Sequence, residues 1–253
     1  MTARTKIYFA SDVHLGATAL KNNRERESLF VKWLEEAGKD AKAIYLMGDI
    51  FDFWYEYRKV VPRGFVRTFG KLADLCDKGI EVHFFIGNHD IWAFSYFEQE
   101  VGMIVHRQPF ETEINGKKFY LAHGDGLGNY EPKYLFLKRC FHSPVLQWIF
   151  SRFHPNLAFT IGHAWSKRSR LSRGKETDVF KGENKEYLYL YAKEMLKQKH
   201  FDFFIFGHRH IAVDIEIGES SRFVNLGDWV KLFTYGVFDG EKFELKKVKE
   251  IVN

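Results

Sequence analysis

Gly48-Asp49-Ile50-Phe51-Asp52 directly follows the apolar run Ala43–Met47, and this combination sets the architecture that we expect. A short apolar run of this kind is typical of a strand buried on both faces of a parallel sheet. Four further motifs place Asp, Asn or His in the same way after an apolar run: Asp12-Val13-His14, Gly87-Asn88-His89-Asp90, His123-Gly124-Asp125 and Gly207-His208-Arg209-His210. Because ligands of α/β sheets bind beyond the carboxyl ends of the strands, the five motifs are expected to deliver their side chains to one place.

Strands and helices alternate through the first half of the chain. Apolar residues at helical spacing predict an amphipathic helix over Arg24–Gly38, and a starting Pro with a closing Gly predicts another over residues 62–79. An Asn-Gly pair at 115–116 predicts the turn of a hairpin over Phe110–Ala122. Strands are expected over residues 6–11, 43–47, 81–86, 201–206, 212–217, 222–226, 232–238 and 242–248.

The segment 126–183 differs in character from the rest of the chain. It lacks strand signals and is rich in aromatic residues, and between Lys133 and Lys185 eleven Lys or Arg accompany three acidic residues. We interpret it as helices inserted between two motifs to form a cap over the site, although its aromatic side chains could equally serve only to pack these helices together. A helix over residues 184–199 then returns the chain to the core. One domain over residues 1–253, with the cap as an insertion, is expected.

Composition limits the classes of protein that remain. A hydrophobic content of 45% and an aromatic content of 17% suffice for a globular core and exclude a disordered chain. Cys76 and Cys140 are too few and too far apart for a disulfide framework, which agrees with a cytoplasmic location. No apolar run approaches the ~20 residues of a membrane-spanning helix, and the early first strand predicts the absence of a signal peptide. The net charge of +5 favours anionic partners.

The motif side chains are those of a two-metal hydrolytic site. Two divalent cations roughly 3.5–4 Å apart lower the pKa of a bridging water and clamp phosphoryl oxygens, as hydrolysis of a phosphate ester or diphosphate requires. Mixed imidazole and carboxylate ligands favour Mn, Fe or Zn over calcium. Any one of these short motifs alone would be an ordinary turn or surface pair, so the prediction rests on the whole set. Six other histidines match no motif and are expected in the core, surface or cap: His83, His106, His142, His154, His163 and His200.

The order and spacing of the five motifs, from residue 12 to residue 210, resemble the calcineurin-like metallophosphoesterase superfamily. The resemblance implies an α/β fold, a four-layer αββα sandwich, and two divalent metal ions, with Mn²⁺ expected and Fe or Zn as alternatives. It also implies that His89 contacts the phosphate and protonates the leaving group, with Asp90 orienting it. The implied ligands are Asp12, His14 and His210 for one metal, Asn88, His123 and His208 for the other, and Asp49 as the bridging carboxylate.

Two stretches, residues 11–16 and 48–54, narrow the resemblance. They look like the UDP-2,3-diacylglucosamine pyrophosphohydrolases of the lipid A pathway, which carry a helical cap between the His-Gly-Asp and Gly-His-x-His motifs. This implies water attack on the UDP side of a lipid-linked nucleotide, releasing UMP and 2,3-diacylglucosamine 1-phosphate. Acyl chains would enter the cap, which would make peripheral contact with an anionic membrane surface on its cytoplasmic side. His89 is a departure, because many members of that hydrolase family carry Arg there.

Three other functions remain open from the sequence. A metallophosphoesterase acting on a soluble phosphodiester or nucleotide diphosphate predicts a closed, polar cap. A non-catalytic scaffold predicts lost ligands, whereas all seven ligand types are present here. A nuclease predicts a nucleic-acid-binding module, and none is recognisable. We therefore expect neither a nucleic-acid partner nor an obligate protein partner.

Overall fold

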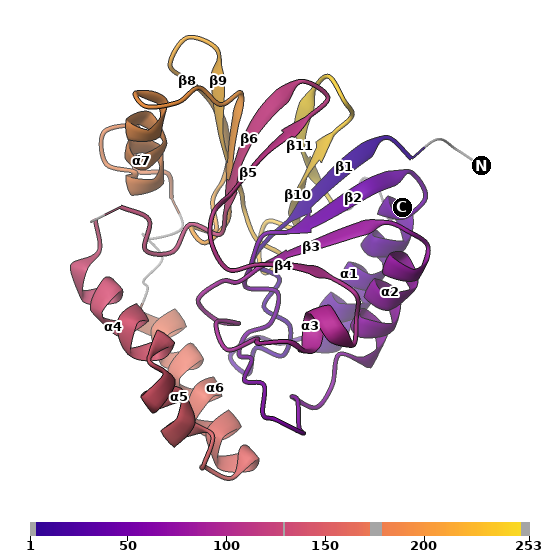
Figure 1. Cartoon of the computed structure of the whole chain (residues 1–253), viewed down its shortest axis with the longest axis vertical. Coiled ribbons are helices and arrows are strands. Elements are labelled where there is room, and N and C mark those ends of the chain that lie inside the picture. Colours follow the sequence, from indigo (N-terminus) through magenta and orange to yellow (C-terminus); the bar gives the residue numbers. More distant parts are fainter. Residues whose placement is uncertain (1–3, 129, 173–178, 249–253) are drawn as a thin grey trace.

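Two sheets face each other, with helices on their outer sides (Figure 1). The computed structural model describes residues 4–128, 130–172 and 179–248. The first sheet has the order β11-β10-β1-β2-β3-β4, formed by Phe243–Lys247, Thr234–Phe238, Lys6–Ala10, Ala41–Leu46, Glu81–Phe85 and Ile104–His106. The second sheet has the order β5-β6-β7-β9-β8, formed by Phe110–Ile114, Lys117–Ala122, Phe203–Phe206, Ser221–Leu226 and Ala212–Ile217.

Helices cover the outer face of each sheet. Against the first sheet lie α1 (Asn23–Ala37), α2 (Val66–Asp77) and the short α3 (Tyr96–Gln99), and against the second lies α7 (Tyr187–Leu196). Three hydrophobic clusters fill the three spaces between the four layers. The four-layer αββα sandwich expected from the sequence is confirmed.

Strand β1 illustrates why its sequence is apolar without interruption. Successive side chains of a strand point to opposite faces. Tyr8 and Ala10 accordingly pack toward α1, whereas Ile7 and Phe9 pack between the two sheets. Both faces of the strand are therefore buried from Ile7 to Ala10, and only its first residue, Lys6, is charged and partly exposed.

The strands that precede the five motifs are parallel within each sheet. β1 pairs with β2 and β2 with β3, while β6 pairs with β7 in the second sheet. Their carboxyl ends therefore lie at the same edge of each sheet, as the sequence predicted.

A helical projection extends from the core below the second sheet (Figure 1). It consists of α4 (Pro132–His142), α5 (Pro144–Phe150) and α6 (Pro155–Ser172). Backbone carbonyls of this projection accept hydrogen bonds from core side chains: Tyr55 Oη donates to Gln147 at 2.9 Å, and Trp92 Nε1 to Phe141 at 2.9 Å. Part of the segment expected to form the cap, residues 129 and 173–178, lies outside the described residues. Among the residues that the structure describes, no helix is long and apolar enough to cross a membrane.

Several local predictions differ from the structure. The helix expected over residues 184–199 forms only over Tyr187–Leu196, and the strand expected over residues 201–206 only over Phe203–Phe206. The helix expected from residue 62 begins only at Val66, because Gly64 and Phe65 have φ of 112° and 59°, a left-handed conformation that a right-handed helix cannot include. Strand β4 was not predicted, since three residues are too short for a recognisable alternation. The Asn115-Gly116 turn is confirmed, with φ of 51° and 75° at its two residues.

Candidate metal centre

The loops that follow the motif strands are hydrogen-bonded to one another. The N–H of Asp12 donates to the Gly48 carbonyl at 3.1 Å, which joins the ends of β1 and β2. The N–H of Gly207 donates to the His123 carbonyl at 2.9 Å, which joins the ends of β6 and β7. A bond from the amide of His208 to Asp12 Oδ2, at 2.9 Å, connects the two pairs across the sheets. The motif side chains are thus held on one continuous backbone framework.

Five motif residues have a left-handed backbone. Asp12, His14, Asp49, His208 and His210 have φ between 48° and 64°. Non-glycine residues adopt this conformation rarely, and when they do the cost is of the order of 1 kcal/mol or more each. Five motif residues thus adopt an unfavourable backbone conformation. This local cost accompanies the inward direction of their side chains.

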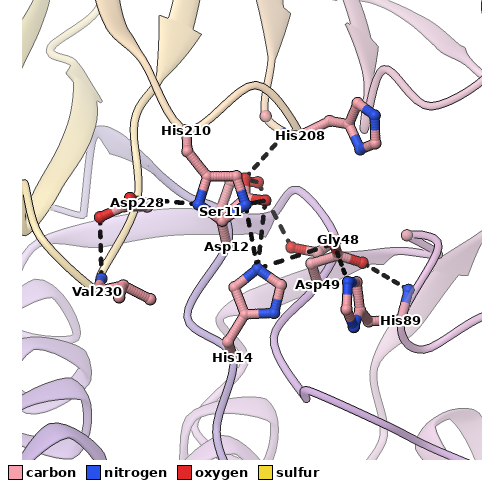
Figure 2. A network of polar contacts seen from close by, with 12 residues as sticks. Ser11, Asp12, His14, Gly48, Asp49, His89, His208, His210, Asp228 and Val230 are labelled. Atoms are coloured by element: carbon pink, nitrogen blue, oxygen red, sulfur yellow. Dashed lines mark hydrogen bonds and ion pairs between the residues drawn. The ribbon is translucent and has the colours of Figure 1, made fainter. Parts of the chain in front are cut away.

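Two carboxylates lie at the centre of the cluster (Figure 2). Asp12 and Asp49 are fully buried. One oxygen of each is occupied, since Asp12 Oδ2 accepts from Ser11 Oγ at 2.6 Å and Asp49 Oδ1 accepts from the His89 amide at 2.8 Å. The second oxygen of each, Asp12 Oδ1 and Asp49 Oδ2, is buried and has no hydrogen-bond partner among the described residues. A buried carboxylate oxygen left in this state is costly unless a cation or a donor meets it.

Imidazole nitrogens surround these two oxygens. Asp12 Oδ1 lies 3.3 Å from His210 Nε2, and Asp49 Oδ2 lies 3.4 Å from His123 Nε2 and 3.9 Å from His14 Nε2. The described residues contain three overlapping groups whose ligand atoms lie within 4.8 Å of one another. They are Asp12 with His14 and His210, His14 with Asp49 and His89, and Asp49 with His123 and His208.

Unpaired atoms at this edge fit divalent cations. Like the two carboxylate oxygens, His123 Nε2 and Asn88 Oδ1 are buried, and the part of the chain that the structure describes offers them no hydrogen-bond partner. His14 Nε2 and His210 Nε2 approach to 3.3 Å, an arrangement in which a shared cation satisfies both nitrogens. The donor set, with carboxylate, amide and imidazole, suits Mn, Fe or Zn. Asp49 belongs to two of the three groups, as a bridging carboxylate would.

Two of the histidine rings are oriented by hydrogen bonds at the ring nitrogen that points away from the centre. His123 Nδ1 donates to the Met47 carbonyl at 2.8 Å, and because a carbonyl only accepts, the lone pair of the neutral ring lies on Nε2, toward Asp49. His210 Nδ1 donates to Asp228 Oδ2 at 3.2 Å. Such partners fix the tautomer and direction of metal-binding histidines.

Electrostatics in the cluster follow from burial and opposite charge. Burial alone would lower the pKa of His123, but the facing Asp49 carboxylate outweighs it and raises this pKa to about 10. Burial raises the pKa of Asp49, whereas His123 and His89 lower it, and the net result lies well below the ordinary value. The opposite pKa shifts of His123 and Asp49 therefore have one cause, the attraction between these two facing groups.

The side chain of Asp90 differs from expectation. Its carboxylate accepts the N–H groups of Gly87, at 2.7 Å, and Ile50, at 3.0 Å. It therefore shapes the loop, and within the described part of the chain its hydrogen bonds do not include the expected one to His89. His89 is oriented by the carbonyl of Asp52, which accepts from Nδ1 at 2.7 Å. A backbone acceptor of this kind leaves no signature in sequence.

Sequence reasoning gave no role to Asp228. Its Gly-Asp pair follows strand β9, just as Gly48-Asp49 follows β2, so the same strand-end signal was present. The Asp228 carboxylate also accepts the amides of Val230, Lys231 and Leu232 through Oδ1, which closes the loop behind His210.

Comparison with known proteins agrees with this geometry. The model of the calcineurin-like phosphoesterases matches residues 5–212. The chain belongs to this family. The resemblance drawn from the five motifs is confirmed, and all five lie within the matched region.

Relatives within the family carry a more specific name. The UDP-2,3-diacylglucosamine hydrolase of Porphyromonas gingivalis is 40% identical, over 98% of this chain and 99% of that protein. Proteins of the same name from Vibrio atlanticus and Actinobacillus succinogenes are 28% and 25% identical, over 95% and 88% of this chain and 96% and 92% of their own lengths.

Proposed function

We propose that this chain hydrolyses the diphosphate of UDP-2,3-diacylglucosamine, giving UMP and 2,3-diacylglucosamine 1-phosphate for lipid A biosynthesis. Support comes from the name of the Porphyromonas gingivalis relative, a UDP-2,3-diacylglucosamine hydrolase to which the chain is similar over nearly its whole length. The physical observation that carries the proposal is a cavity of about 710 Å³ between the candidate metal centre and the helical projection.

The lining of the cavity is complementary to a substrate with one polar end and one apolar end. Asn88 and His89 line it beside the metal centre, where a diphosphate would lie. The rest of its wall is largely apolar, as acyl chains require. Such a lining is the opposite of the polar cap that a soluble substrate would need. The apolar lining side chains include Phe53, Trp92, Leu137, Phe141, Phe150 and Trp165.

We assign the site residues as the sequence suggested. Asp12, His14 and His210 would hold one divalent cation, Asn88, His123 and His208 the other, and Asp49 both, with Mn²⁺ as the proposed metal. Bound there, two cations supply an activated water and neutralise charge on the phosphoryl oxygens. The residues of the chain position those oxygens and exclude bulk water.

His89 would contact the phosphate. The Asp52 carbonyl holds the proton on Nδ1, so Nε2 faces the centre, 3.9 Å from Asp49 Oδ2. Burial lowers the pKa of His89 to about 4, so Nε2 is neutral before substrate enters. A diphosphate placed against the ring would raise this pKa through opposite charge, so that Nε2 takes up a proton from solvent. The ring would then pass this proton to the departing 2,3-diacylglucosamine 1-phosphate and return to its neutral form.

Residues 126–183 would form the cap of a single domain and would dock on the cytoplasmic side of an anionic membrane. Val145 and Trp148 on α5 are 65% and 59% exposed, and Ile149 and Phe153 are also exposed. The segment 132–172 contains seven Lys or Arg and no Asp or Glu. Lys138 and Arg170 pair with the core residues Asp125 and Asp52, and the other five remain to give the segment its positive charge. Apolar side chains beside this positive charge favour an anionic lipid surface.

The decisive experiment measures UMP release from UDP-2,3-diacylglucosamine in detergent micelles with Mn²⁺. UDP-N-acetylglucosamine and bis(p-nitrophenyl) phosphate serve as soluble comparisons. Strong preference for the diacylated nucleotide is expected. Turnover of the soluble compounds alone would refute the substrate while leaving the two-metal chemistry.

Membrane docking is tested separately by sedimentation with vesicles containing phosphatidylglycerol. A Trp148→Ser/Ile149→Ser double variant should lose most vesicle binding and keep the hydrolysis of bis(p-nitrophenyl) phosphate. Wild-type sedimentation of this variant would contradict docking through α5.

A further inference from the structure

Asp52 joins the cap to the metal centre. It closes the Gly48–Asp52 motif and is 2% exposed, yet no ligand role falls to it. On the core side, its Oδ1 lies 3.6 Å from His14 Nδ1, and its backbone carbonyl accepts from His89 Nδ1 at 2.7 Å. One residue thus touches the rear of two imidazoles that face the centre.

The cap approaches the same carboxylate from the other side. Ser166 Oγ donates to Asp52 Oδ2 at 2.7 Å, and the Arg170 guanidinium pairs with Oδ1. Both residues belong to α6 and are four positions apart, so they lie on one face of that helix. Ser166 is buried and the Arg170 side chain is 21% exposed, so this contact is largely shielded from solvent.

We propose that Arg170 and Ser166 are positioning residues, which act through Asp52 to set the direction of the His14 and His89 rings. The cap then completes the catalytic centre in addition to receiving the substrate. The inference rests on the proposed two-metal function, but it does not depend on the identity of the lipid substrate.

The partners of the Asp52 carboxylate explain how the cap affects the direction of the His14 ring. Arg170 and Ser166 occupy the two carboxylate oxygens from the cap side. A buried carboxylate that loses its partner is strongly unfavourable and takes the nearest available donor. That donor is His14 Nδ1, and drawing this nitrogen closer turns the ring and moves Nε2 away from Asp12 and Asp49. Partners behind metal-binding histidines typically contribute 10–100-fold to metal affinity or activity.

The test uses Arg170→Met in the full chain, with two readouts. Hydrolysis of bis(p-nitrophenyl) phosphate reports the centre without acyl-chain binding, and calorimetric titration of chelator-stripped protein reports Mn²⁺ affinity. Both kcat and Mn²⁺ affinity are expected to fall ~10–100-fold, with little change in KM. Arg170→Lys should restore most of each loss, because an ammonium group can also pair with Asp52.

Two control variants separate this effect from general disturbance of the cap. Lys167→Met removes an exposed charge from the same helix, and Tyr55→Phe removes the hydroxyl that binds the Gln147 carbonyl elsewhere on the cap. Both should leave kcat and Mn²⁺ affinity unchanged. An equal loss in Tyr55→Phe and Arg170→Met would overturn the proposal in favour of cap detachment.

Three further outcomes have defined consequences for the proposal. Unchanged kcat and Mn²⁺ affinity in Arg170→Met, with a raised KM for UDP-2,3-diacylglucosamine alone, would make Arg170 a substrate contact and overturn the proposal. If Arg170→Met does not fold, Ser166→Ala provides the same test, with a smaller loss in the same direction supporting it and no loss refuting it. Should the wild-type chain fail to cleave the diacylated nucleotide, the substrate proposal fails, whereas the Mn²⁺ titrations still test the positioning role.

Discussion

Gly87→Ala tests whether Asp49 must stand where the structure places it. A Cβ added at residue 87 would lie 2.3 Å from Asp49 Oδ1 and 2.6 Å from the Asp49 backbone nitrogen. An ordinary contact between such atoms is about 3.5 Å, so the carboxylate or the loop must move by roughly 1 Å. The φ of Gly87 lies outside the left-handed region, so the substitution acts by contact and not by backbone strain.

The size of the effect follows from that displacement. A shift of ~1 Å in a positioned group costs about 10²-fold in rate, equivalent to about 2.7 kcal/mol in the barrier. The movement would also break the bond from the His89 amide to Asp49 Oδ1, which is 2.8 Å long. We therefore expect kcat/KM for UDP-2,3-diacylglucosamine to fall about 10²-fold.

The assay combines steady-state kinetics with elemental analysis of bound metal. Gly70→Ala is the matched control, because a Cβ there meets nothing within 4 Å and residue 70 lies inside α2. This control should retain full activity and gain about 0.5–1 kcal/mol of stability, as Ala replaces Gly in a helix. Wild-type kcat/KM and two bound metals in Gly87→Ala would refute the placement of Asp49 as the bridging carboxylate.

Three further predictions address other groups. His89→Ala is expected to keep its metal content and to lose ~10²–10⁴-fold in turnover, and loss of a metal in elemental analysis would instead make His89 a ligand. Asp228→Asn removes the charge behind His210, while the amide oxygen can still accept the loop N–H groups. Mn²⁺ affinity measured by calorimetry should therefore fall ~10–100-fold, with little change in thermal stability. Unchanged affinity would contradict the orienting role of Asp228. Burial and a neighbouring histidine lower the pKa of His106 to about 4 from its ordinary value of 6.5. The unfolded chain therefore binds a proton at His106 more tightly than the folded chain does. The contribution of the neutral His106 to the free energy of unfolding is complete above about pH 6.5 and is lost as the pH falls toward 4. In denaturant titrations, His106→Gln should therefore lose less unfolding free energy than the exposed-site control His200→Gln over that range, and parallel curves would contradict this explanation.

The parts of the molecule that were predictable are those that depend on local sequence. Buried parallel strands give uninterrupted apolar runs, so the ends of β1, β2, β3, β6 and β7 could be located, and with them the residues that now cluster. The αββα arrangement came from the order of motifs rather than from any single one. Helix α1 was placed within one residue at each end, because its apolar spacing is regular.

Contacts between distant segments were not predictable. The partners of Asp52 on α6 lie more than a hundred residues away, and neither Ser nor Arg at a helical spacing indicates which carboxylate it will meet. The Asp52 carbonyl that orients His89 is a backbone group and leaves no trace in residue type. Asp228 did have a local signal, a Gly-Asp pair after a strand, but that signal acquires meaning only when β9 is known to lie beside β7.

The candidate centre lies on the seam between the two sheets. Asp12 and Asp49 follow strands of the first sheet, whereas His123 and His208 follow strands of the second. Cations bound there would fasten together two layers that otherwise meet through the packing of side chains such as Phe9 and Phe119. A ligand that binds only the folded chain adds about 2.7 kcal/mol of stability at a hundred times its Kd. Metal supply would then govern how long each copy of the chain survives proteolysis in the cell, besides how fast it turns over.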